Sequence, residues 1–248
     1  MKTIKITFLV TLILCFTINL SQAQKYFQIH QDNVKPSKVV EYEKIAKEFN
    51  AACAEHNAQT SWNTATSNDL RYFHITPVEN FADLDKRPFA DMAKAMGDKF
   101  GDMFDRFDKC YDSHSDYILI LDEKLSYQPD GLNMEPEGQN YRKWFYMYYT
   151  PENGKSVREG MKAVKDMFAS KGSKEHYRVY RSGFGCPESF YLVSVSAKDE
   201  VDSAQRGKVN DELLGPDRYE TFSKVMNNIS RMEEYSGRMR PDLAYSPK

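Results

Sequence analysis

Leu125-Ser126-Tyr127-Gln128-Pro129 returns later in the chain, with its Leu, Tyr and Pro kept, as Leu243-Ala244-Tyr245-Ser246-Pro247. The same offset of 118 residues relates Lys25-Tyr-Phe-Gln-Ile-His30 to Lys143-Trp-Phe-Tyr-Met-Tyr148, and Gly97 to Gly215. Similarity that clusters at both ends of a fixed interval indicates a duplicated structural unit. The sequence therefore predicts two halves, at residues 24–128 and 142–248, joined by a Pro-, Gly- and acid-rich linker at residues 129–141.

Each half has the periodicities of the order strand, helix, strand, strand, helix, strand. In the first half we expect strands at residues 26–30, 61–64, 70–76 and 117–121, and helices along Tyr42 to Cys53 and Phe100 to Tyr111. In the second half we expect strands at residues 144–149, 177–181, 190–196 and just before Leu243, and helices from a capping box at Ser156–Glu159 and along Tyr219 to Ile229. This βαββαβ order is the ferredoxin-like one. The expected fold class is therefore α+β, with two ferredoxin-like halves whose sheets cover each other's bare faces in a single-chain α/β barrel.

In this element order and the repeated Leu-x-Tyr-x-Pro tail, the chain resembles the dimeric α/β-barrel superfamily in a tandem, single-chain form. The resemblance covers nearly all of the chain after residue 23 and points to an antibiotic-biosynthesis-monooxygenase-like protein of an uncharacterised exported bacterial branch. The superfamily also includes haem-degrading and haem-dependent enzymes and stress-response barrels. Because its functional residues differ between branches, the resemblance implies where a ligand binds rather than which reaction follows.

The first 23 residues have the parts of a secretory signal peptide. Lys2 and Lys5 precede an almost uninterrupted apolar run at residues 6–20, and Ser21-Gln22-Ala23 offers small residues before a cleavage site. The apolar run of about 15 residues is shorter than the roughly 20 that span a bilayer. We therefore expect an exported protein, periplasmic or extracellular, whose mature chain has no integral membrane segment.

The net charge and the cysteine content argue against nucleic-acid binding and against a fold held by disulfides. Removal of Lys2 and Lys5 leaves 32 basic against 36 acidic residues, a net charge of −4, which provides no electrostatic footprint for nucleic acid. The mature chain keeps Cys53, Cys110 and Cys186, an odd number with no Cys-x-x-Cys spacing. At most one disulfide can form, and we expect buried free thiols.

Strand alternation predicts the side chains that face the space between the two sheets. Phe27, Ile29, Phe73 and Ile75 of the first half are expected to meet the helices, as are Phe145, Met147, Val193 and Val195 of the second. The opposite faces then carry mostly aromatic side chains, several of which end in a hydroxyl group or a ring nitrogen. A lining of this kind suits a flat small molecule. The predicted ligand-binding residues are Tyr26, Gln28, His30, Tyr72, His74, Trp144, Tyr146, Tyr148, Arg178 and Tyr180, with Trp62, Leu192 and Ser194 as further inward residues. The alternative is a solid barrel core that these rings fill.

His30 and His74 are the candidate catalytic residues, as a base or as an axial haem ligand, because imidazole titrates near neutral pH and binds metals. The alternative is that each is a hydrogen-bonded structural residue. No inward Asp or Glu is expected beside them, so no metal site is predicted. No sequence motif indicates a cofactor, although either histidine could be the axial ligand of a haem. His56, His114 and His176 lie near element ends and are expected at the surface.

The expected function is the binding of a small apolar or aromatic ligand between two sheets by an exported protein. One alternative is a cofactor-independent or haem-linked monooxygenase, in which the tyrosines orient the substrate. The other is a non-catalytic structural protein of the cell envelope. The expected partner is a small molecule, and further pairing into a homodimer is left open.

Overall fold

The computed structural model describes residues 25–134 and 136–247, so the predicted signal peptide lies outside the described residues. The first half contains β1 (Tyr26–Val34), η1 (Pro36–Lys38), α2 (Val39–Glu55), β2 (Asn63–Ser67), β3 (Arg71–Val78), η2 (Phe81–Asp85), α3 (Ala90–Met96), α4 (Asp98–Asp108) and β4 (Tyr111–Leu121). The second half contains β5 (Tyr141–Tyr148), η3 (Pro151–Asn153), α5 (Gly154–Ser170), β6 (Tyr177–Ser182), β7 (Phe190–Ala197), α6 (Glu200–Leu214), α7 (Arg218–Met226), β8 (Arg231–Met239) and η4 (Pro241–Leu243).

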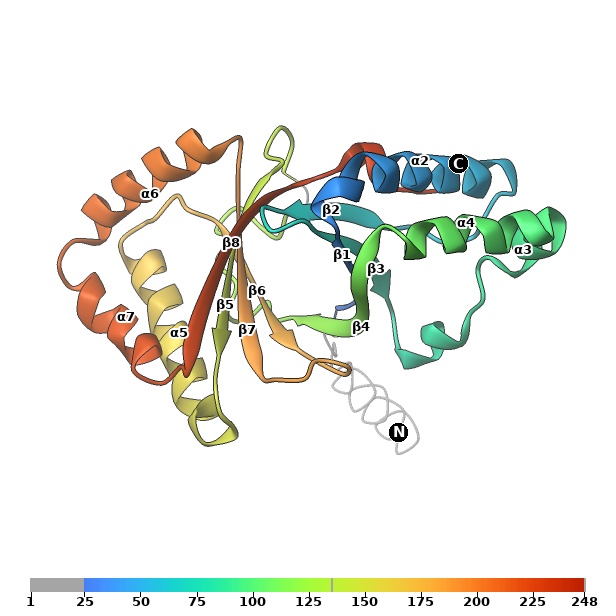
Figure 1. Ribbon diagram of the computed structural model, residues 1–248. Coiled ribbons are helices and arrows are strands. Elements are labelled where there is room, and N and C mark those ends of the chain that lie inside the picture. The colour runs from blue at the N-terminus through green and yellow to red at the C-terminus, as the bar shows by residue number, and fades with distance from the viewer. Residues whose placement is uncertain (1–24, 135, 248) are drawn as a thin grey trace, which may run out of the picture.

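The eight strands close into one antiparallel barrel in the order β1-β3-β2-β8-β5-β7-β6-β4. Figure 1 shows α2, α3 and α4 on one side of the barrel and α5, α6 and α7 on the other. Each half contributes four adjacent strands, and the halves join where β2 pairs with β8 and β4 pairs with β6. The predicted fold class, two ferredoxin-like halves in one α/β barrel, is confirmed.

The interior of the barrel is a packed apolar core to which both halves contribute. Its buried members are Ile29, Ala65, Phe73, Leu119, Trp144, Tyr146, Phe190 and Leu192. Rings from opposite halves meet there, with centroids 6.0 Å apart for Phe73 and Trp144 and 5.8 Å apart for Phe27 and Tyr180. A closed barrel of eight strands is just wide enough for side chains to fill, and these side chains fill it.

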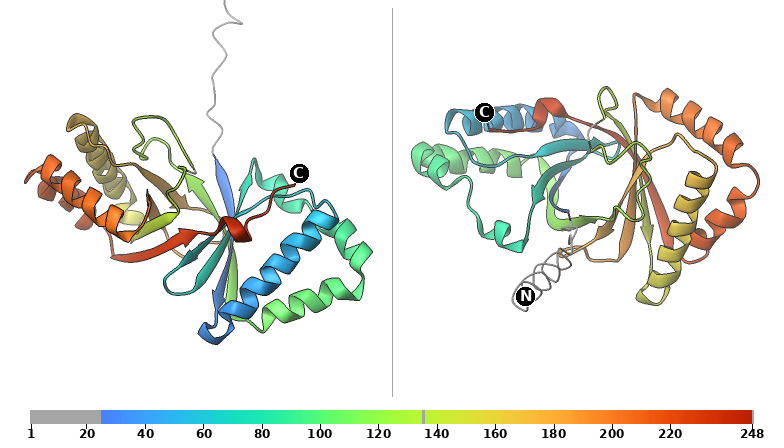
Figure 2. Two further views of the ribbon diagram at one scale, coloured as in Figure 1. Left: turned by 90° about the horizontal axis from the view of Figure 1, so that it is seen from above. Right: turned by 180° about the vertical axis from the view of Figure 1, so that it is seen from behind.

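Each half sends its tail across to the other half. After β4 the chain forms a bridge between Tyr127 and Tyr177, and after β8 it forms one between Trp62 and Tyr245. Figure 2 shows the C-terminal end of the chain beside α2, on the side of the first half. Both bridges are made by the repeated Leu-x-Tyr-x-Pro segments. The repeated sequence is therefore the segment through which each half pairs with a strand or loop of the other half.

Several element boundaries differ from those expected. Residues 61–64 were predicted as a strand, but β2 begins at Asn63 and Trp62 makes only an isolated bridge. Tyr111 begins a long strand instead of ending a helix, because α4 stops at Asp108. The capping box at Ser156 is wrong, since α5 already begins at Gly154. Helix α6 was not expected; its apolar residues follow no single face, so periodicity gives no signal.

The faces predicted for β1 and β3 are wrong. Phe27, Ile29, Phe73 and Ile75 pack into the barrel core, so Gln28, His30 and His74 point to the helix side. In β5 and β7 the predicted faces are confirmed, with Trp144 and Leu192 in the barrel and Val193 against the helices. The 118-residue offset does not preserve the strand face: it pairs outward Gln28 with inward Tyr146. A shift of one residue exchanges the two faces of a strand.

Candidate functional site

Polar side chains occupy two adjacent rows on the outer face of the first half's sheet, beneath its helices. Strand pairing places His74, His30 and Asp116 side by side in one row. The neighbouring row holds Tyr72, Asp32 and His114. The sheet face under a helix layer is normally apolar, because helices bury their apolar stripe against it. The polar groups in this position are therefore unusual, and three of them, His74, His30 and Asp32, border a cavity between sheet and helices.

Tyr42 of α2 joins the two rows. Its side chain is fully buried, and its hydroxyl donates to Asp32 Oδ2 over 2.6 Å and lies 2.9 Å from His74 Nε2. Because the single phenolic proton goes to Asp32, we assign the proton of His74 to Nε2, from which it is donated to the Tyr42 oxygen. His74 Nδ1 lies 3.2 Å from the hydroxyl of Thr64. Because the Thr64 hydroxyl donates to the Leu243 carbonyl, the hydrogen-bonded chain runs from His74 through Tyr42 to Asp32.

The two histidines have opposite protonation states. Burial opposes the charge on His30, but hydrogen bonds and charge from Asp116 and Asp32 outweigh it and raise the pKa of His30 to about 10. Burial lowers the pKa of His74 to about 4, against the charge of Asp32, and the positive charge of His30 adds to the lowering. At neutral pH His30 is a cation and His74 is neutral. Neighbouring groups whose pKa values are driven apart in this way are typical of functional sites.

A cavity of about 910 Å³ lies between these polar rows and the helices. Its wall includes Gln28, His30, Asp32, Tyr42 and His74 on the sheet side. Aromatic side chains contribute the remainder of the wall: Phe49, Trp62, Phe89, Phe100, Phe104, Phe107 and Tyr111. Lys86 and Arg87 border it from the segment that precedes α3. The volume lies within the range of small-molecule sites, which combine apolar walls with a few placed polar groups.

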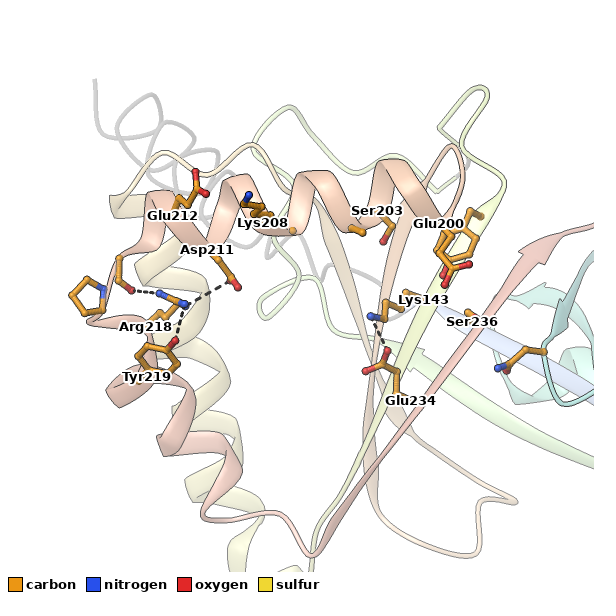
Figure 3. A pocket seen from close by; sticks show the side chains of 16 residues that line it. Lys143, Glu200, Ser203, Lys208, Asp211, Glu212, Arg218, Tyr219, Glu234 and Ser236 are labelled. Carbon is orange, nitrogen blue, oxygen red and sulfur yellow. Dashed lines mark hydrogen bonds and ion pairs between the residues drawn. The ribbon is translucent and has the colours of Figure 1, made fainter.

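The second half has a different hollow, between α6, α7 and the outer face of β5 and β8. Its volume is about 860 Å³, and Figure 3 shows charged side chains around it. Lys143 pairs with Glu234 over 2.7 Å, and the Arg218 guanidinium lies 3.7 Å from Asp211. These are half-exposed surface pairs, and pairs of this kind contribute little binding energy. The first half therefore holds the better candidate site.

The structure divides the predicted ligand-binding residues between two places. Gln28, His30 and His74 line the cavity between sheet and helices. Tyr72 lies on the same face but is directed to Glu43, and the Tyr26 ring packs edge-on against Phe81. Trp144, Tyr146, Tyr148 and Tyr180 lie in the barrel core, and buried Arg178 donates to Ser196 and to the carbonyl of Asn133. Trp62, expected inside the barrel, lines the helix-side cavity instead.

The sequence analysis did not assign four important residues to the site: Asp32, Tyr42, Asp116 and His114. The expectation that no carboxylate lies beside His30 is wrong, because β1 continues to Val34 and brings Asp32 onto the same face. Extending the period-two alternation by one step from His30 would have found it. The same alternation in Asp112-Ser-His-Ser-Asp116 places His114 and Asp116 together.

The residues present do not fit a haem in this cavity. A haem iron needs an imidazole nitrogen that is free to bind it. Among the described residues of the cavity wall, His74 has Tyr42 and Thr64 at its two nitrogens. His30 has Asp116 at Nδ1 and Asp32 at Nε2, so carboxylates flank both nitrogens and leave no room for the porphyrin ring that surrounds a haem iron.

Comparison with solved structures places this architecture among known proteins. A structure described as an anthrone oxidase-like protein is similar with a TM-score of 0.59 and 13% identity, covering 90% of this chain and 94% of that chain. The fold is that of the dimeric α/β-barrel superfamily. Its tandem form, with both ferredoxin-like halves in one chain, matches the closed barrel described above.

Two further dimeric α/β-barrel structures illustrate the range of this fold. A putative monooxygenase from Lactobacillus acidophilus NCFM has a TM-score of 0.51 at 10% identity, covering 90% of this chain and 96% of that chain. A mutant chlorite dismutase from Candidatus Nitrospira defluvii has a TM-score of 0.53 at 10% identity, covering 88% of this chain and 92% of that chain. No family model and no curated protein sequence matches the chain. At these identities the similarity establishes the fold alone.

Proposed function

We propose that the protein binds a small, flat, largely aromatic molecule in the cavity between the first sheet and helices α2, α3 and α4. The observation that carries the proposal is the cavity itself, about 910 Å³ with an aromatic helix side and a polar sheet side. Rings of the ligand would stack against Phe49, Trp62 and Phe107. Gln28 and the Tyr42–His74 pair would hydrogen-bond its polar edge, since few but well-placed polar groups orient a ligand in an apolar site.

The two faces of the first sheet support this position. The barrel side is occupied by packed rings, whereas the helix side combines buried polar groups with open volume. These polar groups bond one another, and together with the aromatic wall they give the combination of apolar surface and a few placed polar groups that is typical of small-molecule sites. A ligand with hydrogen-bonding groups on one edge would make use of both surfaces.

A substitution that fills the cavity tests the proposal. Ala93 lines the cavity from α3, whereas Ala95 is exposed on the same helix and lies outside the lining. With 8-anilinonaphthalene-1-sulfonate as the fluorescent probe, we expect Ala93→Trp to weaken binding roughly tenfold, about 1.4 kcal/mol. Ala95→Trp adds the same ring to the surface and should bind the probe as the wild type does. Equal binding by both variants would place the probe elsewhere and refute the cavity as its site.

The natural ligand can be sought by native mass spectrometry of the protein purified from the exported fraction. A ligand held in the cavity would appear as extra mass that is lost on denaturation. The same measurement reports whether the barrel forms a homodimer. Export itself is part of the proposal, resting on the leader at residues 1–23.

The second candidate function is oxygenation of the bound aromatic molecule without a cofactor. The observation in its favour is the hydrogen-bonded chain from Asp32 through Tyr42 to His74, which ends at the cavity and could pass a proton from a phenolic substrate. Oxygen consumption on addition of the ligand identified by mass spectrometry would support this function. Tyr42→Phe interrupts the chain and should abolish consumption while the ligand still binds; consumption unchanged by Tyr42→Phe would exclude this route.

A further inference from the structure

Three potential metal ligands lie together on the polar rows, and two of them, His30 and Asp32, line the cavity. His30 and Asp32 are alternate residues of β1, and His114 faces Asp32 across the pairing of β1 with β4. One ligand atom from each, an imidazole nitrogen or a carboxylate oxygen, lies within 4.8 Å of the other two. Closeness of this kind arises by chance at exposed surfaces, so it becomes informative only with further evidence.

The further evidence is a buried carboxylate oxygen that accepts no well-aligned hydrogen bond from the described residues. Asp32 is only 3% exposed, and its Oδ2 accepts the proton of Tyr42. Its Oδ1 is buried and, within the described part of the chain, accepts no well-aligned hydrogen bond, although it forms an ion pair with the His30 ring. Oδ1 lies 3.2 Å from His30 Nε2, a separation close to that of two neighbouring ligands around an ion at about 2.1 Å from each. At neutral pH the proton on His30 balances the charge of this oxygen, and a bound metal ion would displace that proton and ligate both Oδ1 and Nε2.

The surrounding side chains already hold the three groups as a metal site requires. Metal-binding histidines usually donate their second ring nitrogen to a carboxylate, and His30 Nδ1 lies 3.0 Å from Asp116 Oδ1. Tyr42 fixes the Asp32 carboxylate in the same way. The His114 ring stacks on Tyr111 with centroids 5.5 Å apart and meets the His30 ring edge-on at 5.4 Å.

We propose that His30, Asp32 and His114 bind one divalent first-row transition-metal ion, of the Fe²⁺, Co²⁺ or Zn²⁺ type. Two imidazoles and one carboxylate are the donor set of such ions, whereas Ca²⁺ and Mg²⁺ prefer oxygen ligands throughout. Three protein ligands leave coordination positions open. Because His30 and Asp32 line the cavity, the open positions would face whatever the cavity contains. The site stands independently of the proposed organic ligand.

The test uses Co²⁺ as a spectroscopic probe and Zn²⁺ for calorimetry, on the mature protein after treatment with a chelator. We expect one ion per chain, with visible Co²⁺ absorption that Zn²⁺ abolishes by displacement. His114→Ala removes an exposed ligand, so the variant should fold, and should bind roughly a hundredfold more weakly. Asp116→Asn removes only the outer support and should weaken binding by about 10- to 100-fold. Asp32→Asn should eliminate binding if the variant folds.

The matched control is His176→Ala. His176 also lies beside a carboxylate, 3.4 Å from Asp130, but outside the cluster, and its loss should leave binding unchanged. The proposal is overturned by absence of Co²⁺ binding in the wild type, by unchanged binding in His114→Ala, or by equally tight binding of Ca²⁺ or Mg²⁺. Ala93→Trp separates the two proposals, because it should weaken binding of the organic probe and leave metal binding unchanged. Metal binding without probe binding, or the reverse, would refute one proposal and support the other.

Discussion

Tyr127 and Tyr245 perform the same task in opposite halves of the barrel. The Tyr127 hydroxyl donates to the carbonyl of Ser173, 2.9 Å away, just beyond the end of α5. The Tyr245 hydroxyl lies 3.0 Å from the carbonyl of Cys53 and 3.1 Å from that of Ala58, at the end of α2. Each tyrosine is buried and comes from the half to which the helix does not belong. The reciprocal exchange satisfies carbonyls at helix ends that have no partner within the helix.

Removing either hydroxyl should therefore destabilise the whole barrel by a similar amount. We expect Tyr127→Phe and Tyr245→Phe each to lower the free energy of unfolding by about 1 kcal/mol, the usual contribution of such a hydrogen bond. The sites are in different halves, so the double variant should lose the sum to within about 0.5 kcal/mol. Urea unfolding followed by circular dichroism measures all three. A double variant with two separate transitions would show that the halves unfold independently.

Gly237 is required where the two halves join. A β-carbon at this position would overlap the Thr66 carbonyl oxygen and lie 2.6 Å from the Trp144 ring. Gly237→Ala should lower the free energy of unfolding by about 1–3 kcal/mol, because the strands β2 and β8 must move apart. Gly207 in α6 is the control: a β-carbon there meets nothing within 4 Å, and Gly207→Ala should stabilise by about 0.5–1 kcal/mol. Thermal unfolding of both variants measures the difference in stability between them. Equal melting temperatures would contradict the close approach of β2 and β8 at Gly237.

An ion pair between Glu43 and Arg240 should make stability depend on pH. The hydrogen bond from Arg240 lowers the pKa of Glu43, against burial and with help from Tyr72. A carboxyl whose folded pKa is depressed stabilises the fold above its unfolded pKa, about 4.3, and this contribution is lost as pH falls through the folded value. Glu43→Gln should cost about 1 kcal/mol at pH 7 and progressively less below pH ~4. Urea titrations at several pH values test this; a constant difference down to pH ~2 would contradict the ionic origin.

The three cysteines among the described residues should differ in reactivity. Cys53, Cys110 and Cys186 are free thiols, of which Cys53 and Cys110 are buried. Burial raises the pKa of Cys53 to about 12, so its reactive thiolate is scarce at neutral pH. In the folded protein we expect Ellman's reagent to modify Cys186 alone, and in urea all three. Cys186→Ser is the control and should abolish the native reaction; rapid labelling of Cys53 in that variant would show that α2 opens readily.

The amino-acid sequence by itself determined the duplication, the βαββαβ order and the presence of His30 and His74 on strands. These features follow from local periodicity, which a strand or helix expresses whatever it packs against. The tail repeat at Tyr127 and Tyr245 was also visible, because both copies perform the same structural task.

Only the tertiary structure decided which face of β1 and β3 lies inside the barrel. Both faces of β1 carry residues that could be buried, and Phe27 and Ile29 enter the barrel because a closed interior excludes polar groups. His30 and Asp32 are then left to the helix side, where Tyr42 of α2 and His114 of β4 join them. Local sequence cannot specify these contacts, because they depend on the closure of eight strands from two halves and on how α2 packs over the first sheet.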